Sequence, residues 1–298
     1  MKWLVYGARG WIGQQVVALL AAQEQEVVAA VSRVDDEVAV AAELAAMAPD
    51  RVVCLTGRTH GGSGTPESPK FGTIDYLEQK GKLAINVRDN LYAPVSLALL
   101  CQAAGIHYTL LNTGCIFEYD EEHPRGGAGF TEADKPNFFA SSYSVVKGFT
   151  DRLLHRIPAL VLRLRMPITG DRNGRNFISK IIQYEKVVDI PNSMSVLSTL
   201  LPILVDLARK QHVGVVNFVN PGAISHSEVL QLYKEIVDPS FEWQTFSVEE
   251  QEKILLAGRS NCYLDTTFLE KEYPTLPSIK EAVRQSLVEM KARDDATV

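Results

Sequence analysis

Short apolar runs alternate with longer amphipathic segments along most of the chain. Runs of strand length, bounded by turn residues, lie at 2–6, 26–31, 51–56, 107–111, 159–164 and 215–219. Helical spacing of apolar residues predicts helices up to about residue 23 and over 37–47, 86–104, 143–155, 196–210, 225–237 and 278–290. This alternation predicts an α/β fold, a Rossmann-type doubly wound parallel sheet with a smaller C-terminal substrate-binding lobe.

The pattern changes after residue 166. We expect residues 1–166 to form a dinucleotide-binding Rossmann domain, to which segments from about 188–220 return. Residues 167–298 are expected to form mainly the substrate-binding lobe, interleaved with the first domain. The longest irregular segment runs from 57 to about 73. It leaves the carboxyl end of a strand, so it either overhangs the cofactor or forms a surface loop, with His60 as a solvated loop residue.

A glycine-rich turn follows the first predicted strand. The seven residues Gly7-Ala8-Arg9-Gly10-Trp11-Ile12-Gly13 lead directly into a predicted helix. Glycines let the turn tighten and let the backbone approach a pyrophosphate, which then lies at the helix N-terminus. We interpret this stretch as a dinucleotide-binding loop, with Gly7, Arg9, Gly10, Trp11, Ile12 and Gly13 at the cofactor. A plain glycine turn is the alternative.

The end of the second predicted strand bears on which dinucleotide binds. A site for NAD usually carries an acidic residue there, which binds the ribose 2′-hydroxyl. Here the strand ends in Ser32 and Arg33, and a hydroxyl with a guanidinium suits a 2′-phosphate. Asp35 and Asp36 lie slightly too far along the chain, where capping of the next helix is the ordinary role. The sequence therefore favours NADPH.

Composition excludes several classes of partner. The chain of 298 residues is 46% hydrophobic and 22% charged, as in ordinary globular enzymes. Its formal net charge of −6 and the lack of a basic stripe argue against nucleic acid. No apolar stretch reaches about 18 residues and no signal-peptide pattern precedes the glycine loop, so we expect no membrane span. Four widely spaced cysteines suit neither zinc nor disulfides, which favours a metal-free protein in a reducing cytosol.

Candidate chemistry gathers after the fourth predicted strand. Thr113 and Cys115 follow its apolar run, at the edge where open α/β sheets bind ligands. Tyr143 and Lys147 are four residues apart, so both lie on one face of the next helix. A nearby lysine favours the phenolate, so we expect it to lower the pKa of Tyr143, a candidate proton donor. Thr113 can hydrogen-bond the same substrate oxygen. For Cys115, a small buried hydrophobe is the ordinary alternative.

With these residues in hand, the chain resembles an extended short-chain dehydrogenase/reductase. More closely, it resembles the UDP-rhamnose-forming bifunctional UDP-4-keto-6-deoxyglucose 3,5-epimerase/4-reductases, which stand alone or as the last domain of plant rhamnose synthases. The resemblance runs from residue 2 to about 288, and residues 57–82 depart from it most. It rests on the segments Gly10-Trp11-Ile12-Gly13, Thr113-Gly114-Cys115-Ile116-Phe117-Glu118-Tyr119-Asp120, Arg165-Met166-Pro167-Ile168, Tyr184-Glu185-Lys186-Val187-Val188-Asp189-Ile190-Pro191-Asn192-Ser193-Met194 and Asp238-Pro239-Ser240-Phe241.

The resemblance implies a role for each candidate residue. A ketone at carbon 4 acidifies the hydrogens on carbons 3 and 5, and inverting both centres needs a base and an acid on opposite faces. Cys115 is implied as the thiolate base and Lys180 as the opposing acid. Hydride from NADPH then reduces carbon 4, while Tyr143 donates a proton, Thr113 binds the oxygen and Lys147 orients the nicotinamide ribose. Apart from the resemblance, Lys180 is a solvated helix lysine.

The resemblance also implies how substrate and partners bind. Arg259 resembles the arginine that related sugar-nucleotide reductases place on the diphosphate, and Asn176 resembles a donor at a helix start. A surface arginine near a turn is the alternative for Arg259. The substrate is implied to be UDP-4-keto-6-deoxyglucose, although the residues do not distinguish uracil from thymine. A homodimer through the helices near 87–104 and 142–155 is implied, with a separate UDP-glucose 4,6-dehydratase as functional partner.

Two other functions stay open. A dTDP-4-dehydrorhamnose reductase would receive sugar that is already epimerised, and it would need neither Cys115 nor Lys180. A non-catalytic NADP-binding sensor would have no reason to keep a proton donor, so the presence of Thr113, Tyr143 and Lys147 together argues against it.

Overall fold

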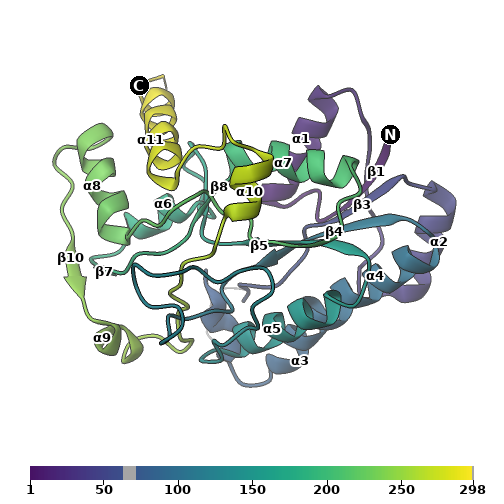
Figure 1. Ribbon diagram of the computed structural model, residues 1–298, viewed down its shortest axis with the longest axis horizontal. Helices are drawn as coiled ribbons and strands as arrows, with labels where there is room; N and C mark the ends of the chain where they lie inside the picture. The colour runs from purple at the N-terminus through teal and green to yellow at the C-terminus, as the bar shows by residue number, and fades with distance from the viewer. Residues whose placement is uncertain (63–71, 297–298) are drawn as a thin grey trace.

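The computed structural model describes residues 1–62 and 72–296, and within them six strands form one parallel sheet (Figure 1). The strand order is β2-β1-β3-β4-β5-β9. The strands are β1 (Lys2–Tyr6), β2 (Glu26–Ala29), β3 (Arg51–Cys54), β4 (His107–Thr113), β5 (Ala159–Leu164) and β9 (Gly214–Val216). The chain turns one way from β1 to β2 and returns on the other side to β3. Ligands of such sheets bind where the order reverses, at the carboxyl ends of these strands.

Helices cover both faces of the sheet, as Figure 1 shows. One face packs against α1 (Trp11–Ala22) and α7 (Leu197–Arg209), and the other against α2 (Glu37–Met47), α4 (Ala93–Ala103) and α5 (Ser142–Leu154). Side chains alternate along each strand, so Trp3 and Val5 face the first pair of helices while Leu4 and Tyr6 face the second set. Each fully buried leucine or valine of these layers stabilises the fold by about 1.5–3 kcal/mol.

The helix expected over 86–104 is longer than predicted and contains a wider turn. It comprises α3 (Leu83–Val87), a π-helical turn at Arg88–Tyr92 and α4. Pro94 has no N–H to donate to the carbonyl of Asn90, and the hydroxyl of Thr150 on α5 donates to that carbonyl instead (2.7 Å). The N–H of Ala93 donates to the carbonyl of Arg88, five residues back. The proline thus explains the widened turn.

The smaller lobe follows β5 and lies at the left of Figure 1. Its apolar core combines residues of the short helix after β6 with residues of the two long helices α8 and α11. Two short parallel strand pairs complete it, β6 with β8 and β7 with β10. The remaining elements are η1 (Ile74–Glu78), β6 (Pro167–Ile168), α6 (Phe177–Ile181), β7 (Lys186–Val188), β8 (Ser195–Val196), α8 (His226–Ile236), β10 (Gln244–Phe246), α9 (Val248–Glu252), α10 (Thr267–Glu272) and α11 (Ile279–Asp295).

The predicted Rossmann-type doubly wound sheet is confirmed. Some predicted bounds differ, since β2 ends at Ala29 and α11 continues to Asp295. The elements β10, α9 and α10 were not predicted, because three to six residues are too few to show a period. Most of the irregular segment expected at 57–73 lies outside the described residues. None of the helices in the described ranges is long and apolar enough to cross a membrane.

Candidate active site

The glycine loop at the carboxyl end of β1 is shaped to accept a diphosphate. Gly7 has a φ of +83°, and the N–H of Gly10 donates to the carbonyl of Gly7 (2.9 Å). A Cβ on Gly13 would lie 2.0 Å from that same carbonyl oxygen, so only glycine fits there. Helix α1 starts at Trp11 with no side chain capping its first N–H groups. Those amides and the positive end of the helix can bind a pyrophosphate.

Three arginines meet two acids beyond the end of β2. Arg33 forms a two-bonded pair with Asp35 (3.0 Å each), and Arg88 lies 3.3 Å from the same carboxylate. Arg88 also pairs with Asp89, and so does Arg58 (2.8 Å each). The group carries one positive charge in excess, and the Arg33 side chain is 68% exposed. An excess cation here suits the 2′-phosphate of NADP more than a 2′-hydroxyl.

Ser32 and Arg9 are placed less directly for that role. The hydroxyl of Ser32 donates to the carbonyl of Ala39 (3.2 Å), and Arg9 is exposed. The carboxylate of Glu43 accepts the backbone N–H groups of Val31 and Ser32 (2.7 and 3.3 Å) and also the Tyr6 hydroxyl. This acid is therefore occupied inside the protein. The cofactor contacts of Ser32 and Arg9 stay predictions.

Helix α5 presents Tyr143 and Lys147 to the carboxyl edge of the sheet. Its first turn is capped by Ser141, whose hydroxyl accepts the N–H of Ser144 (3.1 Å). Both Tyr143 and Lys147 are buried, at 7% and 3% exposed. The Lys147 ammonium lies 3.7 Å from the position that a Cβ of Gly57 would take, just beyond β3. The helix thus directs the lysine to the switch point of the sheet, where a dinucleotide binds.

The expectation that Lys147 lowers the pKa of Tyr143 is wrong. Burial raises the pKa of this phenol well above its usual value, the nearby Cys115 thiol raises it further, and only the hydrogen bond with Thr113 lowers it. Burial also lowers the pKa of Lys147 to about 8, with a small opposing effect of Cys54. Burial is the largest cause of both shifts, and the charge of Lys147 is not among the causes that act on Tyr143. Tyr143 therefore keeps its proton at neutral pH, which a proton donor requires.

Cys115 is fixed between β4 and α5. Its N–H donates to the hydroxyl of Thr113 (3.0 Å), and its carbonyl accepts the hydroxyl of Ser144 (2.8 Å). Among the four cysteines it alone is half-buried, while the other three are buried. These contacts bring Thr113, Cys115 and Tyr143 together at the end of β4.

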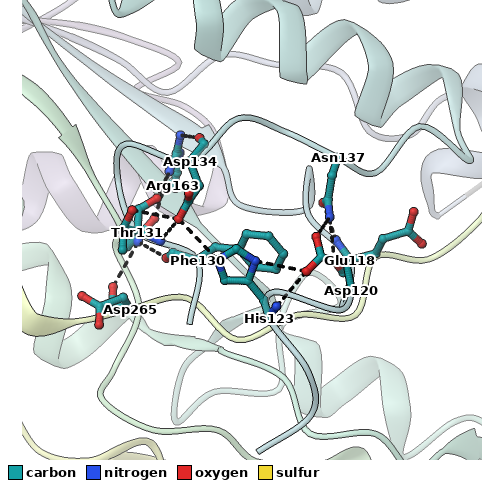
Figure 2. Close-up of polar contacts among 10 residues, drawn as sticks. Glu118, Asp120, His123, Phe130, Thr131, Asp134, Asn137, Arg163 and Asp265 are labelled. Carbon is teal, nitrogen blue, oxygen red and sulfur yellow. Dashed lines mark hydrogen bonds and ion pairs between the residues drawn. The ribbon is translucent and has the colours of Figure 1, made fainter. Parts of the chain in front are cut away.

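The loop that runs from Cys115 to α5 is anchored by polar contacts, as Figure 2 shows. The His123 ring stacks on Phe130 with centroids 3.9 Å apart and contacts the carboxylates of Asp120 (3.1 Å) and Asp134 (3.6 Å). Arg163 on β5 donates to the backbone carbonyl of Asp134 (3.3 Å) from the opposite side. The loop is therefore tied to the sheet, and the positions of Cys115 and Tyr143 at its two ends are tied with it.

A second group of cations comes from the smaller lobe. Burial lowers the pKa of Lys180 on α6, and the charges of Arg175 and Arg259 lower it further. No hydrogen bond or ion pair holds the Lys180 ammonium in the described part of the chain. His60 is half-buried rather than solvated, and burial together with the charges of Arg175, Arg58 and Lys180 lowers its pKa to about 4.

Asp75 joins this cationic group to Tyr143. Its carboxylate binds the Arg259 guanidinium and accepts the backbone N–H groups of Leu256 and Ala257 (3.0 Å each). The next residues of η1, Tyr76 and Leu77, pack against Tyr143. The diphosphate contact of Arg259 stays a prediction, because this structure pairs the side chain with Asp75.

Asn176 is occupied within the protein. Its amide nitrogen donates to the carbonyls of Thr169 (2.9 Å) and Asp171 (2.7 Å), and its amide oxygen caps α6 by accepting the N–H of Ile178 (3.1 Å). Asn176 therefore shapes the start of the helix that carries Lys180. Its direct contact with substrate stays a prediction.

Comparison with known proteins decides the family. No family model matches the chain. A solved structure of the L780 protein of Acanthamoeba polyphaga mimivirus, named a UDP-rhamnose synthase, superposes with a TM-score of 0.92 at 49% identity over 97% of this chain and 99% of that one. A bifunctional dTDP-4-dehydrorhamnose 3,5-epimerase/reductase of Arabidopsis thaliana is 42% identical over 95% of this chain and 91% of its own. The chain belongs to the bifunctional nucleotide-sugar 3,5-epimerase/4-reductases.

A longer relative places the epimerase/reductase within a larger enzyme. A trifunctional Arabidopsis protein, named a UDP-glucose 4,6-dehydratase, 3,5-epimerase and reductase, is 40% identical over 98% of this chain. The match spans 43% of that protein.

Several charged residues near the candidate site had no signal in the sequence pattern. Asp75, Arg58 and Arg175 lie in segments without a clear period, and Arg88 lies in the helix predicted over 86–104; at such positions a charged residue is ordinarily solvated. The sequence predicts His60 as a solvated loop residue for the same reason. For Arg58 and His60 the available signal was position, since both lie shortly after the carboxyl end of β3.

Proposed function

We propose that this protein converts UDP-4-keto-6-deoxy-D-glucose to UDP-β-L-rhamnose, by 3,5-epimerisation followed by NADPH-dependent reduction of the 4-ketone. The observation that carries the proposal is the grouping of Cys115 with Thr113 and Tyr143 at the end of β4. A reductase needs the threonine and the tyrosine, but it has no use for a half-buried cysteine in the same place. The names of the mimivirus and Arabidopsis relatives support both reactions.

In the epimerisation, Cys115 acts as the base and Lys180 as the acid. The thiolate removes the proton from carbon 3 or carbon 5, and the electrons move into an enolate stabilised by the neighbouring carbonyl at carbon 4. Lys180 returns a proton from the opposite face. Burial and the nearby arginines lower the pKa of this lysine, so its ammonium releases a proton more readily than an exposed lysine would.

In the reduction, NADPH supplies hydride to carbon 4 when bound. Tyr143 donates its O–H proton to the oxygen that becomes an alkoxide, and the hydroxyl of Thr113 binds the same oxygen. Lys147 holds the ribose hydroxyls of the nicotinamide nucleoside. The glycine loop and the first turn of α1 hold the diphosphate, and the cluster around Arg33 holds the 2′-phosphate.

A homodimer through α4 and α5 is part of the proposal. Large apolar side chains remain exposed on these helices, including Phe149 (59%), Leu153 (45%) and Leu99 (50%). A pair of such faces would bury them, and a monomeric mass in light scattering would refute this contact.

A separate UDP-glucose 4,6-dehydratase is proposed to supply the substrate, since a trifunctional relative carries that activity in one chain. The cytosol is the proposed compartment, and the four cysteines are free, as a reducing compartment would keep them.

Product analysis tests the proposal. The protein is incubated with UDP-4-keto-6-deoxyglucose and NADPH, and the sugar is identified by NMR. UDP-β-L-rhamnose is the expected product. A 6-deoxy sugar that retains the configuration at carbons 3 and 5 would instead identify a plain 4-reductase, and no product with any 4-keto sugar nucleotide would support the sensor.

A further inference from the structure

Two arginines at the end of β5 are completely buried, but a carboxylate balances the charge of only one of them. Arg163 donates through Nε and Nη2 to both oxygens of the Asp151 carboxylate (2.9 and 2.8 Å). Arg165, two residues later, has no carboxylate among its partners in the part of the chain that the structure describes. Both side chains are 0% exposed. One buried cation is neutralised and the other is not.

The partners of Arg165 are all uncharged. Its guanidinium donates to the carbonyl of Gly114 (3.0 Å), the carbonyl of Ser193 (3.2 Å), the carbonyl and hydroxyl of Ser260 (3.1 and 2.8 Å) and the amide oxygen of Asn192 (2.6 Å). These bonds satisfy its donors but leave its positive charge. Burying an uncompensated charge costs free energy, so we expect this charge to have a functional role.

Few titratable groups feel this charge. They are Cys115, Cys262 and Tyr119, whose proximity raises the pKa of Arg165 although burial alone would lower it, together with His226, whose own pKa lies near 4. Burial raises the pKa of Cys262 to about 11 and that of Tyr119 to about 12, so these two and the histidine are neutral at physiological pH. No carboxylate is among them. Among these groups Cys115 alone is a half-buried cysteine at the end of β4, so it is the one whose charge the proposed reaction can use.

Arg165 also fixes the backbone next to Cys115. It binds the carbonyl of Gly114, the residue before the cysteine, and a Cβ on Gly114 would lie 3.0 Å from the Cγ of Arg165. The strand end is thus packed directly on the arginine side chain. A change at Arg165 would alter both the electrostatic field at the thiol and the support of its backbone.

We propose that Arg165 is a positioning residue for Cys115, and that its uncompensated charge favours the thiolate that epimerisation requires. The thiol proton is released to solvent and the negative sulfur remains beside the guanidinium. This inference rests on the proposed function, in which Cys115 is the base. It makes a separate prediction, however, because the ionisation of a thiol can be followed without any turnover.

Alkylation of Cys115 by iodoacetamide as a function of pH tests whether the charge of Arg165 favours the thiolate. Cys115 alone among the cysteines is partly exposed, and peptide mass spectrometry confirms the modified site. Arg165→Gln is expected to move the pH midpoint of alkylation upward by about 1 unit or more. Arg165→Lys keeps a cation and is expected to restore part of the shift. A folded Arg165→Gln protein with the wild-type midpoint would overturn the proposal.

A second variant neutralises the charge and leaves the arginine in place. Asn192→Asp puts a carboxylate at the atom that accepts from Arg165, and the midpoint is again expected to rise. Asn217→Asp is the matched control, because Asn217 contacts Arg163 (3.4 Å), whose charge Asp151 already balances. Its midpoint is expected to stay unchanged. Equal shifts in the two variants, or none in either, would contradict the proposal.

Activity assays separate this inference from the proposed function. In Arg165→Gln at pH 7, deuterium exchange into the 4-keto sugar is expected to slow at least tenfold, and more than reduction of pre-epimerised sugar does. A wild-type protein that neither exchanges nor reduces would remove the proposed function, and the alkylation midpoints would still decide the role of Arg165. An active wild-type enzyme whose Arg165→Gln variant alkylates normally would remove the inference alone.

Discussion

Raising the pH should lower the rate of reduction, because Lys147 loses its positive charge. Burial lowers the pKa of this lysine from 10.5 to about 8, so its ammonium is present below pH 8 and is lost as the pH rises above it. At pH 9 about one molecule in ten keeps the charge, and kcat/KM for NADPH should fall about tenfold below its plateau. Tyr143 does not titrate in this range, because burial raises its pKa far above the usual value.

The assay follows NADPH consumption between pH 6.5 and 9.5. Pre-epimerised 4-keto sugar is the substrate, so that Cys115 and Lys180 do not contribute to the profile. The control is Lys147→Arg, whose guanidinium keeps its charge throughout and whose profile should be flat although its rate is lower. A wild-type profile that stays flat to pH 9.5, or a falling limb that persists in Lys147→Arg, would refute the reasoning.

Three further predictions concern other residues. Tyr143→Phe should lower the rate of reduction by about 10² to 10⁴ while deuterium exchange continues, and reduction at a near-normal rate would remove the proton-donor role. Arg33→Asp should raise KM for NADPH more than KM for NADH, since it reverses a charge in the group proposed to bind the 2′-phosphate; equal changes would mean that the phosphate lies elsewhere. Asp151→Asn should lower the free energy of unfolding in urea by about 3–5 kcal/mol, because it leaves the buried Arg163 unpaired. Its control is Asp206→Asn, which breaks a pair with the 61% exposed Lys210 and a bond from Tyr273; a loss as large as that of Asp151→Asn would contradict the argument.

The sequence predicts features whose cause is local. The glycine loop, the helix that carries Tyr143 and the four-residue spacing of Tyr143 and Lys147 depend on neighbouring residues, and the structure has each of them where expected. The parallel direction of the strands follows from the alternation of strand and helix.

The remaining features depend on residues that are distant in the chain. Asp75 and Arg259 are 184 positions apart, and no pattern along the sequence joins them. Whether the charge of Arg165 is balanced depends on whether the fold places an acidic residue beside it, as it does for Arg163. The pKa of Tyr143 was predicted with the wrong sign because spacing shows that the lysine is near but does not show how deeply both groups are buried.

Proton exchange in heavy water tests the central claim most directly. The protein is incubated with UDP-4-keto-6-deoxyglucose without NADPH, and deuterium in the sugar is measured by mass spectrometry. The account predicts deuterium at carbons 3 and 5 with the wild-type protein and its loss in Cys115→Ser. No exchange with the wild-type protein, while NADPH is still consumed with pre-epimerised substrate, would contradict the account and leave a simple 4-reductase.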